Sequence, residues 1–476
     1  MKTVVYNFFI VLLMIAVGTS CKVPQYALKT KSQPMPDSYS NNLSDTTNIA
    51  KVKWKNYFKD QNLIALIDTA LQNNQELHIV QQEISISLNE VKARKGEYMP
   101  FVGIRGGAGL DRAGSFTRLG ALEKNVNIEP GKPFPSPLTD FLVGFNSSWE
   151  IDVWNKLRNA KKSAFSRYMA SQEAKNFLIT RLIAEIASSY YELMALDNLL
   201  EIVKKNIELQ TNALQIIKQE KESAKVSQLA VNRFEAQLLN TTNLQYEIQQ
   251  RIVETENRIH FLIGGFPKNI ARNSSSFTAL STDSLFVGIP KQLLQNRPDV
   301  RQAEWELQAT GLDIKSAKAN FYPSFRLNGF IGMQAFQPHL LFNPESLVLS
   351  LFGDALAPLI NKNAIQANYY KSHHKQAQAT YKYQQTILNA YLEVMNQISA
   401  VKNYSGSYQN KQKESDILSQ SVDISNDLFK YARADYMEVL LTQREALNTK
   451  MELTEIKLKQ LTAKVNIYKS LGGGWY

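Results

Sequence analysis

The sequence predicts a mainly α-helical protein with membrane-crossing β-strands, built from an internal duplication. Three observations lead to this fold class. The phrase LQNNQEL at Leu71–Leu77 recurs as LQNRPDV at Leu294–Val300. Two long stretches of the chain contain no proline and at most one glycine, and four shorter segments between helices differ in composition, one of them with clear alternation of apolar and polar residues. With 476 residues, the chain also exceeds what one hydrophobic core usually serves, which favours a repeat.

The repeated phrase gives the offset between the two halves of the chain. Asn296 follows Asn73 by 223 residues, and the two Gly-Gly pairs that close the helical stretches are 208 residues apart. We therefore expect two similar halves, a first repeat over 61–266 and a second over 291–476, joined by a linker over 267–290. Each half is predicted to run helix, strand, strand, long helix, helix.

The N-terminus has the composition of an export signal. A basic Lys2, an apolar stretch too short for a spanning helix, and small residues precede Cys21, the only cysteine. The GTSC sequence resembles the box before the acylated cysteine of bacterial lipoproteins. We expect a signal peptide over 1–20, lipid attachment at Cys21, and an extended lipid-anchored segment over 21–60. In the alternative interpretation, Cys21 is an incidental residue at a cleavage site.

Proline and glycine delimit the predicted helices, because both interrupt long helices. Phe145–Ile263 contains neither, and Leu359–Leu471 contains no proline and a single glycine. Polar turn sequences, ESAKVSQL and YARADYMEV, divide each stretch into helices of about 65 and 38 residues, roughly 100 and 57 Å long. Shorter helices at Asn62–Tyr98 and Lys291–Phe321 are expected to open the two halves.

The repeated phrase itself is interpreted as structural. We expect Asn73 and Asn296 to mark equivalent helix starts, and Pro298 suits the first turn of a helix. The NRPDV sequence is therefore predicted to cap a helix and to pack, and not to contact a substrate.

Four segments between the helices have the pattern of strands. They are FVGIRGGAGL, FLVGFNSSWEID, SFRLNGFIGMQ and LVLSLFGD, and in the second of them Phe141, Val143 and Phe145 alternate with polar or small residues. Strands of about 9 to 11 residues cross a bilayer. Four strands cannot close a membrane barrel, so a membrane location requires oligomerisation, and three copies would supply twelve strands. The alternative is an antiparallel sheet in a soluble domain.

Five sequences resemble the TolC-like outer membrane efflux channels, specifically their lipoprotein branch that serves resistance-nodulation-division pumps. These are CKVPQY, SSWEIDVWNKLRNA, IPKQLLQNRPDVRQAEWEL, AKANFYPSFRLNG and YMEVLLTQREAL, which together with the repeat span nearly the whole chain. The resemblance implies a trimer with a twelve-stranded β-barrel, continued by a long α-helical coiled-coil barrel in the periplasm. It also implies a location in the cell outer membrane.

The residues offer little for catalysis. No cysteine and histidine spacing typical of a metal site occurs, and phosphate-binding loops and nucleophile elbows are absent. The net charge of +11 is spread along the chain, which argues against a nucleic-acid partner. We therefore predict a protein that is not an enzyme and that has no cofactor or metal.

A conduit needs a constriction, and the resemblance implies one at the helix tips of the second half. Met437, Glu438, Leu441 and Arg444 are the corresponding candidates for a periplasmic gate, with the arginine as a tether and the glutamate as an acidic ring. In the alternative interpretation, Glu438 only solvates a coiled-coil tip and Leu441 packs between helices.

The predicted function is a passive trimeric duct of a tripartite efflux pump, exporting small molecules from periplasm to exterior. Its expected partners are a periplasmic adaptor protein, an inner membrane resistance-nodulation-division transporter and outer membrane lipid. Two alternatives are a channel for ATP-driven protein secretion and a lipid-anchored structural coiled coil.

Overall fold

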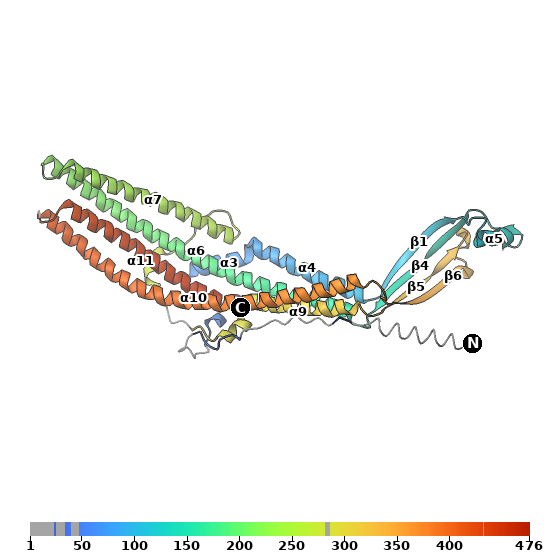
Figure 1. The fold of residues 1–476 in the computed structure, drawn as a ribbon. Coiled ribbons are helices and arrows are strands. Elements are labelled where there is room, and N and C mark those ends of the chain that lie inside the picture. Colours follow the sequence, from blue (N-terminus) through green and yellow to red (C-terminus); the bar gives the residue numbers. More distant parts are fainter. Residues whose placement is uncertain (1–22, 25–33, 40–46, 281–285, 432) are drawn as a thin grey trace. The chain divides into compact units, whose positions relative to one another are not determined.

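The computed structural model describes residues 23–24, 34–39, 47–280, 286–431 and 433–476 (Figure 1). Cys21 and the predicted signal peptide lie outside these residues. The chain divides into two compact units, and each takes residues from both halves of the sequence. The strand unit comprises Ser85–Met169 and Trp305–Tyr381 with residues from the N-terminus, and the helical unit comprises Lys31–Ile84, Ala170–Glu304 and Lys382–Tyr476.

The strand unit contains a four-stranded antiparallel sheet in the order β1-β4-β5-β6 (Figure 1). Its strands are β1 (Phe101–Asp111), β4 (Leu138–Ile151), β5 (Ser324–Ala335) and β6 (Leu347–Leu356). All four coincide with the predicted segments, which confirms the strand pattern read from the sequence. Among the described residues, β1 pairs only with β4 and β6 only with β5, so the sheet has two open edges.

The two faces of this sheet differ in chemistry. Ile104, Phe145, Ile331 and Leu349 are direct neighbours across the four strands and are 76, 55, 49 and 75% exposed. Side chains of the other parity are mostly polar or glycine, as in the hydrogen bond between Ser148 and Asn328. The sheet therefore leaves a continuous apolar face without cover in the protomer.

The connections between paired strands differ in length. Between β1 and β4 lie α5 (Arg118–Asn125), β2 (Asn127–Glu129) and β3 (Lys132–Pro133), where the predicted order of elements has no further helix or strand. Thr117 caps α5 by accepting the Gly120 N–H. The shorter connection between β5 and β6 holds two turns of 3₁₀ helix, η4 (Pro338–Leu340) and η5 (Pro344–Ser346).

The long helices begin and end close to the predicted turns. They are α6 (Lys156–Glu222) with 67 residues, α7 (Gln228–Leu262) with 35, α10 (Asn363–Lys430) with 68 and α11 (Tyr436–Ser470) with 35. The first and last residues of α7 and α11 both differ by 208, the offset found in the sequence. None of the helices that the structure describes is long and apolar enough to cross a membrane.

The opening helices correct one prediction. Each is interrupted: α3 (Gln61–Asn73) is followed by α4 (Gln75–Tyr98), and α8 (Leu293–Asn296), after the turn η3 (Pro290–Gln292), is followed by α9 (Pro298–Ala319). Asn73 and Asn296 are thus the last residues of helices and not equivalent helix starts. Pro298 does begin α9, as predicted.

The interruption has a physical cause in the docking of the closing helix. The Asn74 side chain donates to the Leu262 carbonyl at the end of α7 (2.8 Å) and accepts the Leu77 N–H (3.0 Å). In the second half, Arg297 donates to the Ser470 carbonyl at the end of α11 (3.0 Å). Asn74 and Arg297 both have extended backbones. Each residue is the C-cap of one helix and directly precedes the first residue of the next helix.

The first glycine of each Gly-Gly pair lies at the same two contacts, which we call the joints. The first joint is between Asn74 and the end of α7, and the second is between Arg297 and the end of α11. Gly264 and Gly472 have φ of +67° and +87°, and an added Cβ would lie 2.3 Å from the Asn73 oxygen and 2.4 Å from the Asn296 oxygen. Left-handed backbone and this close approach both require glycine. The repeated phrase and the repeated glycines are therefore the two sides of one contact, made once in each half. This agrees with the prediction that NRPDV has a capping and packing role.

The main hydrophobic core of the helical unit includes residues of α3, α4, α6 and α7 around the first joint. Short elements of the N-terminal part, η1 (Ile49–Lys51) and α2 (Trp54–Tyr57), lie beside it, and η2 (Ser274–Ala279) follows α7. Fully buried members include Leu63, Ile67, Ile186, Tyr190 and Phe277. Tyr190 also donates a hydrogen bond to Asp60, the cap of α3, so the core fixes where α3 begins.

Candidate functional site

The predicted gate residues lie in the first three turns of α11. Asp435 precedes the helix, and its side chain forms no capping hydrogen bond. Glu438 and Arg444 are exposed, Leu441 is 39% exposed and Met437 is half-buried. Met437, Leu441 and Arg444 are four and three residues apart, so they share one face of the helix. The buried face of α11 is a different one, with Val439, Ala446 and Leu447.

The tips of the two halves pack against each other in the helical unit. Leu214, Ile217, Ala230, Val231 and Phe234 form a buried cluster, and Phe429, Tyr436 and Leu440 of the second half pack against it. This cluster holds the start of α11 and leaves Glu438, Leu441 and Arg444 exposed in the protomer, while Met437 is half-buried.

Equivalent positions in the two tips have opposite environments. Ala230 is fully buried, whereas Glu438, which is 208 residues later, is exposed. A carboxylate at the Ala230 position would be buried without a partner, which is costly. The second half can therefore carry charge at a position where the first half cannot.

One contact at this tip was not predicted. The Arg233 guanidinium of α7 lies 2.6 Å from the Met437 sulfur, Nη1 to Sδ. Arg233 is the equivalent of Leu441 by the 208-residue offset, but no pattern of nearby residues links it to Met437, which lies 204 residues later. The structure thus brings Met437 together with a first-half arginine, while Arg444 has no ion pair within the part of the chain that the structure describes.

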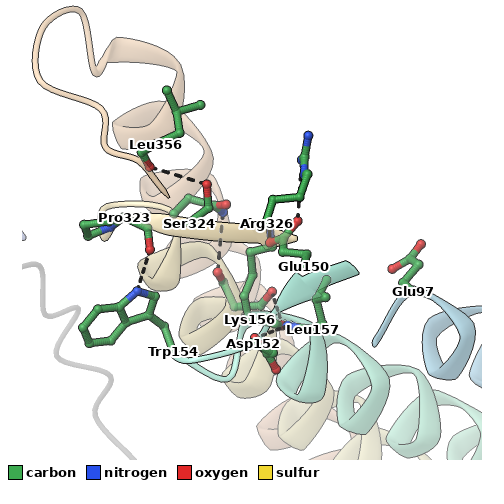
Figure 2. Close-up of polar contacts among 12 residues, drawn as sticks. Glu97, Glu150, Asp152, Trp154, Lys156, Leu157, Pro323, Ser324, Arg326 and Leu356 are labelled. Carbon is green, nitrogen blue, oxygen red and sulfur yellow. Dashed lines mark hydrogen bonds and ion pairs between the residues drawn. The ribbon is translucent and has the colours of Figure 1, made fainter. Parts of the chain in front are cut away.

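A second polar region lies where the strands join the long helices (Figure 2). Asp152 accepts the N–H groups of Leu157 and Arg158 and so caps α6. Glu150 pairs with Lys156, and Arg326 lies 3.9 Å from the same carboxylate. These bonds fix the direction in which α6 leaves β4.

The described residues contain no group of three histidine, cysteine, aspartate or glutamate side chains able to hold a metal. His373 packs edge-on against Tyr369, with ring centroids 4.6 Å apart. Burial, and secondarily His374, lower the pKa of His373. This environment favours a neutral packed imidazole.

The fold and these surfaces define a class of protein: a duplicated helical subunit with an uncovered apolar sheet and an uncovered helix tip, suited to symmetric assembly. The model of the outer membrane efflux protein family matches residues 66–265 and 289–473, and the chain therefore belongs to that family. The two matched segments correspond to the two halves of the duplication.

Individual relatives are similar over most of their length. The cation efflux system protein CusC of Escherichia coli O6:H1 is 23% identical, with 96% of each chain covered. The solvent efflux pump outer membrane protein SrpC of Pseudomonas putida is 26% identical, over 89% of this chain and 87% of SrpC. The Campylobacter jejuni CmeC outer membrane channel superposes with a TM-score of 0.84 at 19% identity, covering 94% of both chains.

Family membership confirms the resemblance stated from the sequence. The chain is an outer membrane channel subunit of an efflux system, and the prediction that it is not an enzyme agrees with this membership. The comparisons do not test the gate residues or the lipid anchor, which stay predictions.

Proposed function

We propose that three copies of this chain form a closed outer membrane duct through which a tripartite pump exports small molecules from the periplasm. The observation that carries the proposal is the four-stranded sheet with one exposed apolar face and two open edges. Inside a bilayer, unpaired edge groups are too costly to persist, so β1 of one copy pairs with β6 of the next. Three copies then give a twelve-stranded barrel.

The long helices continue the duct into the periplasm and place the α10–α11 tips at its inner end. Met437, Glu438, Leu441 and Arg444 line the constriction there, a proposal supported by the exposure of the last three in the protomer. Arg444 pairs with a carboxylate of a neighbouring copy and tethers the closed tip. Three Glu438 side chains form a ring that favours cations.

The partners are an adaptor protein in the periplasm and a resistance-nodulation-division transporter in the inner membrane. Acylated Cys21 anchors the mature N-terminus in the outer membrane. The names of the relatives, which include cation and solvent efflux proteins, support export of small molecules and not of proteins. The pump, and not the duct, selects the cargo in this scheme.

Mass measurement of the purified protein in detergent tests the assembly. We expect a mass of three chains, and single-channel conductance after insertion into planar bilayers. A stable monomer without conductance would refute the duct, and it would favour a lipid-anchored coiled coil.

A further inference from the structure

An open groove of about 470 Å³ lies at the start of α6, against the end of α9. Five polar side chains line it: Asn155, Asn159 and Lys162 of the α6 side, and Lys315 and Lys318 of α9. Trp154 and Tyr322 close its end nearest the strands. We call this the junction groove.

The junction groove has an excess of positive charge. Lys162, Lys315 and Lys318 are exposed, and none of them has an ion pair within the described part of the chain. No carboxylate lines the groove. The nearest ones along the chain are engaged, because Asp152 caps α6 and Asp313 pairs with Arg167 and accepts a hydrogen bond from Ser163. Three lysines without a carboxylate in the groove favour the binding of an anion there.

The walls and the aromatic end of the groove are fixed in place. Ser163 and Ser316 each donate a hydrogen bond across the two helices, to the Ala309 carbonyl (3.1 Å) and to the Lys156 carbonyl (3.0 Å). Trp154 stacks on Tyr322 with centroids 4.8 Å apart, and its indole N–H donates to the Pro323 carbonyl (2.7 Å), a contact visible in Figure 2. Trp154 as a whole residue is still 42% exposed, so it presents an apolar surface near the lysines.

The position of the groove indicates what fills it. Trp154 and Tyr322 lie within three residues of the ends of β4 and β5. If the strands span the hydrocarbon layer, these rings lie at the headgroup level, where tryptophan and tyrosine are enriched. Lys318 lies in the last turn of α9, four residues before Tyr322, and Lys315 lies about one turn earlier. A headgroup layer is roughly 5–8 Å thick, and a long lysine side chain can extend to phosphates within it.

The groove is lined by residues next to the ends of β4 and β5, the two central strands of the sheet, whereas the open edges belong to β1 and β6. Strand pairing between copies at those edges therefore does not involve the groove residues.

We propose that the junction groove binds the headgroup phosphate of an anionic phospholipid in the periplasmic leaflet of the outer membrane. The three lysines and two asparagine amides hold the phosphate, and the Trp154–Tyr322 stack contacts the glycerol and upper acyl chain. The proposal rests on the proposed function, since it needs the strands to cross the bilayer.

Native mass spectrometry of the detergent-solubilised full-length protein tests this site. We expect the trimer to retain up to three molecules of added phosphatidylglycerol and to bind phosphatidylcholine at least tenfold more weakly. The triple variant Lys162→Gln/Lys315→Gln/Lys318→Gln should lose phosphatidylglycerol affinity at least tenfold without a change in trimer mass, because all three side chains are exposed.

The matched control changes Lys92 and Lys95, which precede Lys315 and Lys318 by the 223-residue repeat offset and are also exposed. The variant Lys92→Gln/Lys95→Gln should retain affinity within about twofold. Equal losses in both variants would show diffuse attraction and overturn the site, and so would full displacement of the lipid by millimolar inorganic phosphate. A monomer in the same spectrum refutes the duct itself, whereas a trimer without selective lipid loss refutes only the groove.

Discussion

Replacing Arg297 should show how strongly the second joint is held, because this side chain is a buried charge at the centre of it. Only 5% of the Arg297 side chain is exposed. It donates to both Asp299 oxygens (2.9 and 2.6 Å), to Glu393 (2.7 Å) and to the Ser470 carbonyl (3.0 Å). Burial lowers the pKa of Arg297, but the bonds and charges of Asp299 and Glu393 more than reverse this, so the net pKa is raised.

The cost of Arg297→Ala comes mainly from the groups left behind. Asp299 is 18% exposed and would lose its ion pair with Arg297, whereas Glu393 is 50% exposed and remains solvated. Removing one partner of a buried pair costs about 3–5 kcal/mol. The matched change in the first half, Asn74→Ala, removes two neutral hydrogen bonds and should cost about 1–3 kcal/mol.

Guanidinium unfolding of the detergent-solubilised protein, followed by the helical circular dichroism signal, measures both changes. We expect the midpoint to fall further for Arg297→Ala than for Asn74→Ala, with similar slopes. The double variant Arg297→Ala/Asp299→Ala should recover part of the loss, because it removes the uncompensated carboxylate. If Arg297→Ala costs no more than Asn74→Ala, the buried charge is not what holds this joint and the reasoning is wrong.

Further changes test the glycine, the gate and the anchor. Gly472→Ala should lower the free energy of unfolding by about 1–3 kcal/mol, because the new Cβ sits on left-handed backbone 2.4 Å from the Asn296 oxygen. The control Gly265→Ala should change it by less than about 0.5 kcal/mol. Equal unfolding midpoints for the two variants would contradict this prediction. Arg444→Ala should raise single-channel conductance, and Glu438→Gln should reduce cation preference without changing the trimer; two unaltered channels would place the constriction elsewhere. Cys21→Ala should abolish palmitate labelling, and a retained label would exclude that acylation site.

If the gate variants leave the channel unchanged, the first-half tip becomes the candidate. Lys225 and Gln228 are exposed there, at the turn between α6 and α7. Their substitution would then alter conductance in the same assay.

Local patterns predicted the strands and the long helices well. Alternation of apolar and polar residues marks β4 because one face of the sheet is apolar and the other polar, and the polar turn sequences mark the ends of α6 and α10. The 208-residue offset also predicted that α7 and α11 begin and end at equivalent positions of the two halves. These features depend on residues close together in the sequence.

The interruption between α3 and α4 could not be predicted in this way, whereas Pro298 does mark the start of α9 in the second half. Nothing in the residues around Asn74 forbids a continuous helix, and the break arises because the end of α7 docks there. Arg233 was missed for a similar reason, as its contact with Met437 joins two tips that are distant in the sequence. The short helix α5 was missed because its eight residues lie in a proline- and glycine-rich connection.

The unequal strand connections show where this chain tolerates added length. The offset between the halves falls from 223 residues at the opening helices to 208 at the closing helices. That 15-residue difference equals the difference between the connections 112–137 and 336–346. After duplication, insertions or deletions were thus accommodated in the strand connections, while the helices stayed in phase. A peptide epitope inserted near Gly131 should accordingly be displayed without disturbing the fold, making this connection a practical attachment point for labels.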